Sequence, residues 1–214
     1  MTPRPVDEAP ADCPLCPRLV TYRQSLRAEE PDWHNNPVDS FGDPDARLLV
    51  VGLAPGVRGA NRTGRPFTGD FAGDLLYGTL GLMGFTRGAF DARADDGMRL
   101  VDCMVTNAVR CVPPKNKPVG PEINACRPFL AARINALEHL SEIVTLGRIA
   151  HDSTIRALGE RLKDHPFGHG ARSDVGMFTI TASYHCSRYN TNTGVLTPAM
   201  FERVFSSVRK RLDA

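Results

Sequence analysis

Residues 47–70 read RLLVVGLAPGVRGANRTGRPFTGD, and the rest of the chain is best interpreted from this stretch. Its first part, 47–53, is almost entirely apolar, as expected for a strand that is covered on both faces of a parallel sheet. The glycines that follow give the backbone the freedom to approach a ligand closely. Open α/β sheets bind their ligands in such loops, at the carboxyl ends of their strands. We therefore interpret 52–70 as the active-site loop.

Apolar and amphipathic stretches alternate along the remaining sequence. Further strands are predicted at 100–109, 141–146 and 177–182. Helices are predicted at 17–27, 71–83, 121–139, 148–163 and from Thr197 onwards. The region 121–139 is expected to form two helical pieces, because Pro128 would break a continuous helix. Strands that alternate with helices predict an α/β fold with a parallel sheet between helices.

The composition is that of an ordinary globular protein. The 214 residues fit one domain, and the net charge of +2 excludes a strongly basic molecule. Residues 1–12 are rich in Pro, Asp, Glu and Ala, so we expect disorder there and a single domain over 13–214. No apolar run is long enough to cross a bilayer, and no secretory signal is visible, which predicts a cytoplasmic protein without a membrane partner. Basic residues gather in a few loops, which fits either a polyanionic partner or a solvated surface.

Four of the six cysteines form a pattern typical of a metal site. Cys13 and Cys16 are a C-x₂-C pair, and Cys111 and Cys126 follow with fourteen residues between them. Four thiolates are a complete ligand set for zinc or for an iron–sulfur cluster. The spacing alone is compatible with zinc, with an iron–sulfur cluster and with no metal at all. Cys103 lies within an apolar strand and is expected to be a small buried hydrophobic residue.

The loops that follow the predicted strands offer side chains suited to a planar base. Asp70 and Phe67 belong to the first loop, Asn107 ends the second strand, and His185 follows the fourth. An aromatic ring stacks on a base, an amide reads its edge, and a histidine donates to an oxygen. No Gly-Lys-Ser/Thr follows the glycines, and the dinucleotide glycine spacing is absent, so neither phosphate-binding motif is present.

Each of these residues also has an ordinary structural explanation. Asp70 immediately precedes a helix, where Asp is a favoured N-cap. Phe67 would fill the core, and Asn107 would be a turn residue at a strand end. His185 taken alone would be a hydrogen-bonded structural histidine.

Four motifs, taken in order, resemble those of one known family. GLAPG at 52–56, ANRTGRPFTGD at 60–70, TNAVRCVPP at 106–114 and YHCSRYNTNTGVLTP at 184–198 resemble the family 5 (B-type) uracil-DNA glycosylases. The match runs from Cys13 to the last helix. The resemblance implies a three-layer α/β/α sandwich with a central four-stranded parallel sheet. It also implies that the protein holds a [4Fe–4S] cluster. It also implies removal of uracil, and often of hypoxanthine or xanthine, from DNA.

The resemblance also implies which residues carry the chemistry. The cluster ligands would be Cys13, Cys16, Cys111 and Cys126. Asp70 would stabilise the sugar cation or orient the attacking water. His185, with backbone N–H groups of the turn at 53–56, would stabilise the departing base. Sister families often place Asp, Asn or Glu in the first motif, whereas Leu53 and Ala54 are apolar here, so water activation would rest on Asp70.

The remaining implied residues contact the substrate. The base-binding set is Gly52, Ala54, Phe67 and Asn107, in which Phe67 stacks on the flipped base and Asn107 bonds to its Watson–Crick edge. The DNA-binding set is Arg62, Arg65, Lys117 and Arg188 on phosphates, with Tyr189 as the wedge that fills the vacated stack.

Three function classes therefore compete. The leading hypothesis is a monofunctional DNA glycosylase that acts as a monomer on nucleoid DNA. A non-catalytic iron–sulfur module would instead capture damaged DNA and release no base. A redox protein is least favoured, because the clustered cysteine spacing of ferredoxins is absent.

Overall fold

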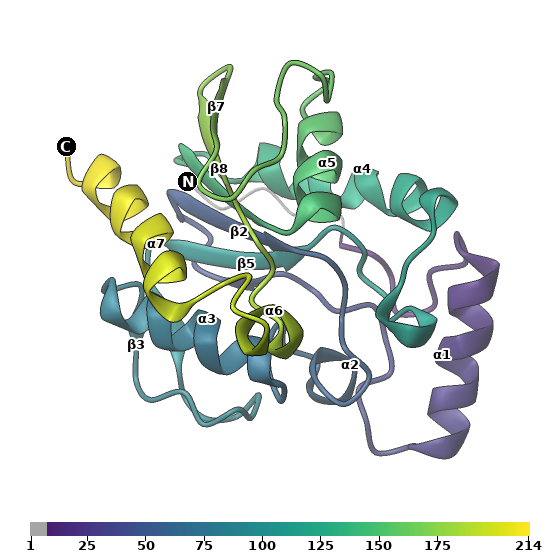
Figure 1. Cartoon of the computed structure of the whole chain (residues 1–214). Coiled ribbons are helices and arrows are strands. Elements are labelled where there is room, and N and C mark those ends of the chain that lie inside the picture. Colours follow the sequence, from purple (N-terminus) through teal and green to yellow (C-terminus); the bar gives the residue numbers. More distant parts are fainter. Residues whose placement is uncertain (1–7) are drawn as a thin grey trace.

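The computed structural model describes residues 8–214, and helices and strands alternate along it as predicted (Figure 1). The helices are α1 Pro17–Glu29, α2 Ala60–Thr63, α3 Phe71–Leu82, η1 Pro114–Asn116 (a 3₁₀ turn), α4 Gly120–Ala136, α5 Arg148–Ala157, α6 Arg188–Asn192 and α7 Pro198–Leu212. The strands are β1 Phe41–Gly42, β2 Leu48–Gly52, β3 Thr86–Arg87, β4 Arg99–Leu100, β5 Cys103–Asn107, β6 Glu142–Leu146, β7 Arg172–Val175 and β8 Phe178–Ser183.

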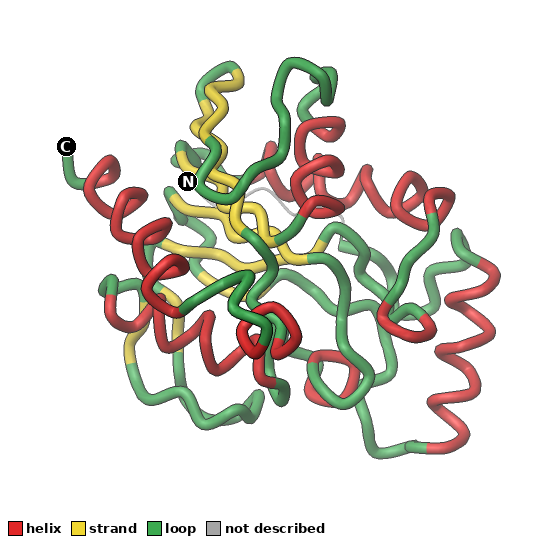
Figure 2. The backbone as a smooth tube through the Cα atoms, in the orientation of Figure 1, coloured by secondary structure: helices red, strands yellow, loops and turns green. Residues whose placement is uncertain are grey.

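A sheet forms the centre of the molecule (Figure 2). It has six strands in the order β1-β5-β2-β6-β8-β7. Its four inner strands are parallel, which confirms the predicted four-stranded parallel sheet. The short strands β1 and β7 pair antiparallel at the two edges and were not predicted. Because the inner strands are parallel, their carboxyl ends meet along one edge of the sheet.

Helices cover both faces of this sheet, as the apolar run in β2 predicts. All five residues of β2 are buried, and successive side chains point to opposite faces. Leu48 and Val50 pack in the cluster that contains α3 and α7, whereas Leu49 and Val51 pack in the cluster that contains α4 and α5. The three-layer α/β/α sandwich is therefore confirmed (Figure 1). Among the described residues, no helix combines the length and apolar character that a membrane span requires.

The predicted break at Pro128 is wrong, because α4 runs through this residue without interruption. A proline inside a helix removes one backbone hydrogen bond and costs about 3 kcal/mol. Cys126, Leu130 and Ile134 lie four residues apart along α4, and all three are buried on the inner face of the helix. Tertiary packing of that face outweighs the local cost of the proline.

Two other element boundaries differ from the prediction for local reasons. The apolar run at 100–109 is divided into β4 and β5 by Asp102, whose φ is +56°. The carboxylate of Asp102 accepts two hydrogen bonds from the Arg47 side chain, which fixes the turn. Helix α5 ends at Ala157 instead of 163, because Gly159 takes a left-handed conformation with φ of +82°.

The expectation of disorder at 1–12 falls partly on residues 1–7, which lie outside the described residues. The described part of this segment lies against the domain. Ala9 is buried, and Glu8 forms ion pairs with Arg110 and Arg133. These two cations explain why an acidic, proline-rich segment is held in place.

Two glycines of α3 provide a matched stability test. A Cβ at Gly73 would overlap the carbonyl oxygen of Phe67, whereas nothing lies within 4 Å of a Cβ at Gly78. We expect Gly73→Ala to lower the free energy of unfolding by about 1–3 kcal/mol through overpacking. Gly78→Ala should raise it by about 0.5–1 kcal/mol, because alanine loses less backbone entropy in a helix.

Denaturant unfolding of both variants measures these changes. Equal effects of the two substitutions would show that the helix does not contact Phe67 as described.

Candidate active site

A cavity lies at the carboxyl edge of the parallel sheet, among the predicted site residues. Its volume is about 640 Å³, within the range of small-molecule binding sites. It is lined by Leu53, Ala54, Pro55, Gly56, Ala60, Phe67, Gly69, Asp70, Phe71, Ala72, Asn107, Asn116, His185, Ser187 and Arg188. The sequence-predicted residues Asp70, Phe67, Asn107 and His185 therefore share one cavity, although they come from three separate segments of the chain.

Phe67 occupies its position because Gly52 has no side chain. A Cβ at Gly52 would lie 2.5 Å from Cζ of Phe67 and closer still to Oδ1 of Asn107. Phe67 itself adopts a φ of +51°, which is uncommon for an aromatic residue. Its ring lies 6.2 Å from that of His185, with 27° between the ring planes. The strained backbone of Phe67 and the missing side chain at Gly52 together place an aromatic ring beside His185.

Asn107, the last residue of β5, presents an unpaired acceptor. Its side chain is almost completely buried, yet Oδ1 has no hydrogen-bond partner within the described chain. A buried polar atom without a partner costs free energy, so an exception of this kind needs an explanation. A ligand with an N–H group that enters the cavity would satisfy this oxygen.

Asp70 combines a structural contact with a place in the cavity. It is the N-cap of α3, and its carboxylate accepts a hydrogen bond of 3.2 Å from the backbone N–H of Gly73. Burial raises the pKa of Asp70, while the backbone hydrogen bonds from Gly73 and Ala72 oppose this change. A Cβ at Gly56 would lie 3.1 Å from Oδ2, so the glycines of the loop leave this oxygen room in the cavity. Asp70 therefore caps α3 and also lines the cavity.

His185 is held in the cavity as a neutral imidazole. Burial lowers its pKa to about 4, because a charged ring would lose its hydration. The side chain of Asn190 donates a 2.8 Å hydrogen bond to the His185 carbonyl oxygen, which fixes the loop after β8. At neutral pH the ring can donate one N–H to a ligand without carrying a charge.

The predicted DNA-binding residues divide into two groups. Arg62, Lys117, Arg188 and Tyr189 are exposed, and Tyr189 retains 74% of its accessible surface. Arg188 lies in the cavity lining, with its guanidinium 5.4 Å from the ring centroid of Phe71. These four side chains can reach a partner in solution.

Arg65 corrects the sequence-based prediction, because it is buried and unavailable to a phosphate. Its side chain is 4% exposed and forms an ion pair with Asp96, whose side chain is fully buried. No local pattern indicates this pairing, because Asp96 lies 31 residues away along the chain.

The sequence analysis missed several lining residues, among them Phe71, Ser187 and Asn116. Phe71 and Ser187 flank predicted residues, and Asn116 comes from the loop between Cys111 and Cys126. Asn116 has a φ of +55°, a conformation that asparagine tolerates better than most residues. The only signal for Asn116 in the sequence was an asparagine in a proline- and lysine-rich loop. This signal did not indicate that the residue would line the cavity.

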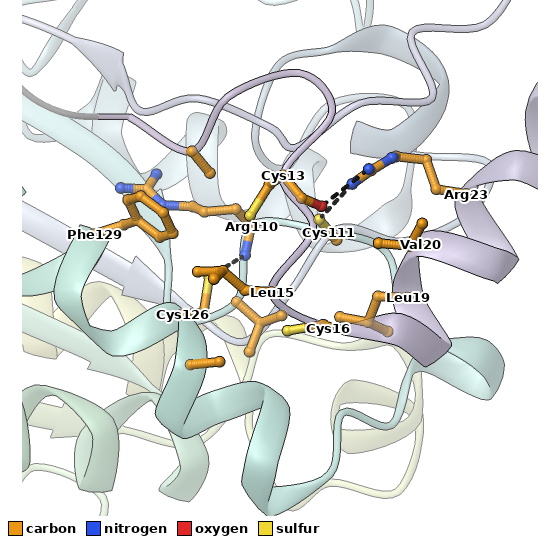
Figure 3. Close-up of a pocket in the computed structure, with 13 residues that line it drawn as sticks. Cys13, Leu15, Cys16, Leu19, Val20, Arg23, Arg110, Cys111, Cys126 and Phe129 are labelled. Carbon is orange, nitrogen blue, oxygen red and sulfur yellow. Dashed lines mark hydrogen bonds between the residues drawn. The ribbon is translucent and has the colours of Figure 1, made fainter.

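The four patterned cysteines converge in a second, separate pocket. Figure 3 shows Cys13, Cys16, Cys111 and Cys126 around a common space, with α1 on one side and α4 on another. Among residues 8–214, no three Cys, His, Asp or Glu side chains are arranged to hold a single metal ion. Cys103 is fully buried in β5, as predicted.

A buried arginine faces these cysteines. Arg23 of α1 is 2% exposed, and it donates 3.4 Å to Sγ of Cys111 and 3.2 Å to the carbonyl oxygen of Cys13 (Figure 3). No carboxylate in the described part of the chain pairs with it, and its Nε has no partner there. The backbone N–H of Arg110 also donates 3.2 Å to Sγ of Cys126. Buried charges are normally paired with an opposite charge. The four cysteines become anionic thiolates when they bind a metal, so a metal group held by them would pair with Arg23.

The chain is similar to known proteins over most of its length. Residues 40–209 match the uracil DNA glycosylase superfamily. The chain is 44% identical over 205 residues to the type-5 uracil-DNA glycosylase of Thermus thermophilus, covering 92% of this chain and 93% of that protein. It is 38% identical to the type-5 enzyme of Mycobacterium tuberculosis, covering 92% and 77%, and 38% identical to that of Pyrobaculum aerophilum, covering 87% and 83%.

The superfamily match begins after Cys13 and Cys16, but the similarity to the type-5 proteins covers most of the chain. The similarity to the Thermus thermophilus protein covers 92% of this chain. The chain belongs to the uracil DNA glycosylase superfamily, among its type-5 members.

Proposed function

We propose that this chain hydrolyses the N-glycosidic bond of uracil in DNA and leaves an abasic site. The convergence of Asp70, Phe67, Asn107 and His185 on one cavity carries this proposal. The type-5 relatives, which are named uracil-DNA glycosylases, support it independently. An enzyme cannot reach this bond within a stacked duplex, so the target nucleotide must be flipped into the cavity.

The cavity offers contacts to both the face and the edge of a base. Phe67 presents its ring for stacking, which is tolerant of base identity because every base has a π-face. Oδ1 of Asn107, which has no partner within the described chain, accepts an N–H from the Watson–Crick edge. Together these contacts hold a flipped uracil beside His185.

Cleavage breaks the bond between the sugar C1′ and the base nitrogen, and the bonding electrons leave with the base. His185 donates an N–H to a base oxygen and stabilises the anion that forms, together with backbone N–H groups of the turn at 53–56. Asp70 stabilises the positive charge on the sugar or orients the water. The water oxygen then bonds to C1′, and the water gives up one proton. The departing base anion takes up one proton, so that the products are the abasic sugar and the neutral base.

The proposed substrate range includes the deaminated purines hypoxanthine and xanthine. A cavity of about 640 Å³ is larger than a pyrimidine requires, and stacking on Phe67 does not select between ring sizes. Arg62, Lys117 and Arg188 contact phosphates in this proposal, and the exposed ring of Tyr189 fills the vacated stack. The proposed working form is a monomer that acts on the chromosomal DNA of the cytoplasm.

We also propose that Cys13, Cys16, Cys111 and Cys126 hold a [4Fe–4S] cluster. Four thiols from two distant segments, beside a buried guanidinium without a carboxylate in the described chain, fit such a group. The cluster would supply a cross-link between the N-terminal segment and the loop at 111–126. No catalytic step is assigned to it.

Base release from synthetic duplexes tests the function directly. Wild-type protein with its metal should convert a uracil-containing duplex, and duplexes with hypoxanthine or xanthine, into alkali-labile abasic products. Failure on uracil with the cluster intact would contradict the proposal. Tight binding of the duplex without base release would favour the non-catalytic module instead.

The substitution Asp70→Asn separates the two roles of this residue. Asparagine caps helices as well as aspartate, so the melting temperature should not fall. Loss of the carboxylate should reduce the single-turnover rate of base release by about 10²-fold or more. Duplex binding measured on the same variant should be retained, and an unchanged rate would remove Asp70 from the mechanism.

The pH dependence follows from the two pKa shifts in the cavity. Activity requires ionised Asp70, whose pKa is raised, and neutral His185, whose pKa is lowered to about 4. The value of kcat/KM should therefore fall only on the acid side, as Asp70 and His185 become protonated. An inflection near the ordinary histidine value of about 6.5 would contradict the neutral His185 described here.

The cysteine pocket is tested by metal content. Wild-type protein purified without oxygen should be brown and contain about four irons, the number in a [4Fe–4S] cluster. Cys126→Ser should lose colour, iron and thermal stability together, whereas Cys103→Ala should keep its iron because Cys103 lies outside the pocket. A colourless wild-type protein that contains zinc would contradict the cluster and support the zinc alternative.

A further inference from the structure

The Arg65–Asp96 ion pair joins the active-site loop to the segment before β4, and neither residue lines the cavity. We propose that this pair is a positioning device that fixes residues 65–68, so that Phe67 is held in its strained conformation against Gly52. The inference rests on the proposed glycosylase function for its kinetic consequence. Neither residue contacts the substrate.

The ion pair is bidentate and enclosed. Nη1 and Nη2 of Arg65 donate to the two carboxylate oxygens of Asp96 at 2.8 and 2.6 Å. Asp96 also accepts hydrogen bonds from the backbone N–H groups of Asp91 and Met98, so its own loop is fixed. The aromatic rings of Phe41, Tyr77 and Phe90 surround the guanidinium, with centroids 5.2–5.6 Å from its central carbon.

Contacts from this pair and its neighbours secure both sides of Phe67. Nε of Arg65 donates 2.7 Å to Oγ1 of Thr68, and the hydroxyl of Tyr77 donates 2.7 Å to the carbonyl oxygen of Pro66. Phe67 lies between these anchored residues. A residue in a rare conformation remains there only when its surroundings leave it no alternative. Arg65 is the anchor that joins this loop to a separate part of the chain.

Stability alone gives a poor reason for such a pair. A buried ion pair gains little over well-packed apolar residues of similar volume, whereas removal of one partner leaves an uncompensated charge. The double variant Arg65→Met/Asp96→Leu therefore removes the directional anchor without leaving a buried charge. This separates positioning from folding.

We expect this double variant to melt near the wild-type temperature and to release uracil about 10²-fold more slowly in single turnover, because a small displacement of a positioned group has that effect. Its affinity for an undamaged duplex, and the salt dependence of that affinity, should match wild type. An arginine that bound phosphate would instead show weaker binding and a smaller salt slope.

Matched controls use another bidentate pair. Arg211 and Glu142 form a similar ion pair at 2.6 Å, outside the cavity lining. Arg211→Met/Glu142→Leu should leave the single-turnover rate unchanged. Where the first double variant folds poorly, Arg65→Lys keeps the charge but loses the two-pronged contact, and it should show a smaller loss of rate with duplex affinity retained.

A wild-type rate in Arg65→Met/Asp96→Leu, or a loss that follows duplex affinity, would overturn the inference. A crystal structure of this variant provides a readout that does not depend on activity. Phe67 should leave its positive φ, and an unchanged Phe67 would also overturn the inference. If wild-type protein releases no base, the proposed function fails, and this structure alone decides the positioning role.

Discussion

The close packing of Phe67 against Gly52 and Gly73 is the constraint on which the candidate active site depends. The ring of Phe67 lies where a side chain at Gly52 would be, and its carbonyl oxygen lies where a side chain at Gly73 would be. Strand β2 and helix α3 thereby hold the two ends of one loop against the same residue. The cavity exists because the loop that begins after β2 must fold back over the strand before α3 begins.

Charges buried away from solvent hold the surroundings of this cavity together. Arg65 and Asp96 join the active-site loop to the segment before β4, and Glu8 joins the N-terminal segment to Arg110 and Arg133. Arg23 has no carboxylate partner in the described residues and faces the cysteines instead. The paired cations fix segments that are far apart in the sequence, because a buried charge is stable only with its partner in place.

The cavity and the cysteine pocket are connected through a single loop. Residues 111–126 begin and end at cysteines of the pocket, and Asn116 of the same loop lines the cavity. The loop has few regular contacts of its own, since only the 3₁₀ turn η1 and the start of α4 are helical within it. Anchoring its two ends therefore limits where Asn116 can lie.

The sequence by itself determined the sheet, its parallel strands and the loops that carry Asp70, Phe67, Asn107 and His185. Apolar runs and glycines act locally, and parallel strands necessarily bring their carboxyl ends to one edge. Only the tertiary structure decided that Arg65 is buried, that α4 continues through Pro128, and that Asn116 reaches the cavity. These outcomes depend on partners distant in the sequence, such as Asp96 for Arg65 and the buried core beneath α4. No local pattern records such a partner, because the free energy that decides the outcome arises only when the segments pack together.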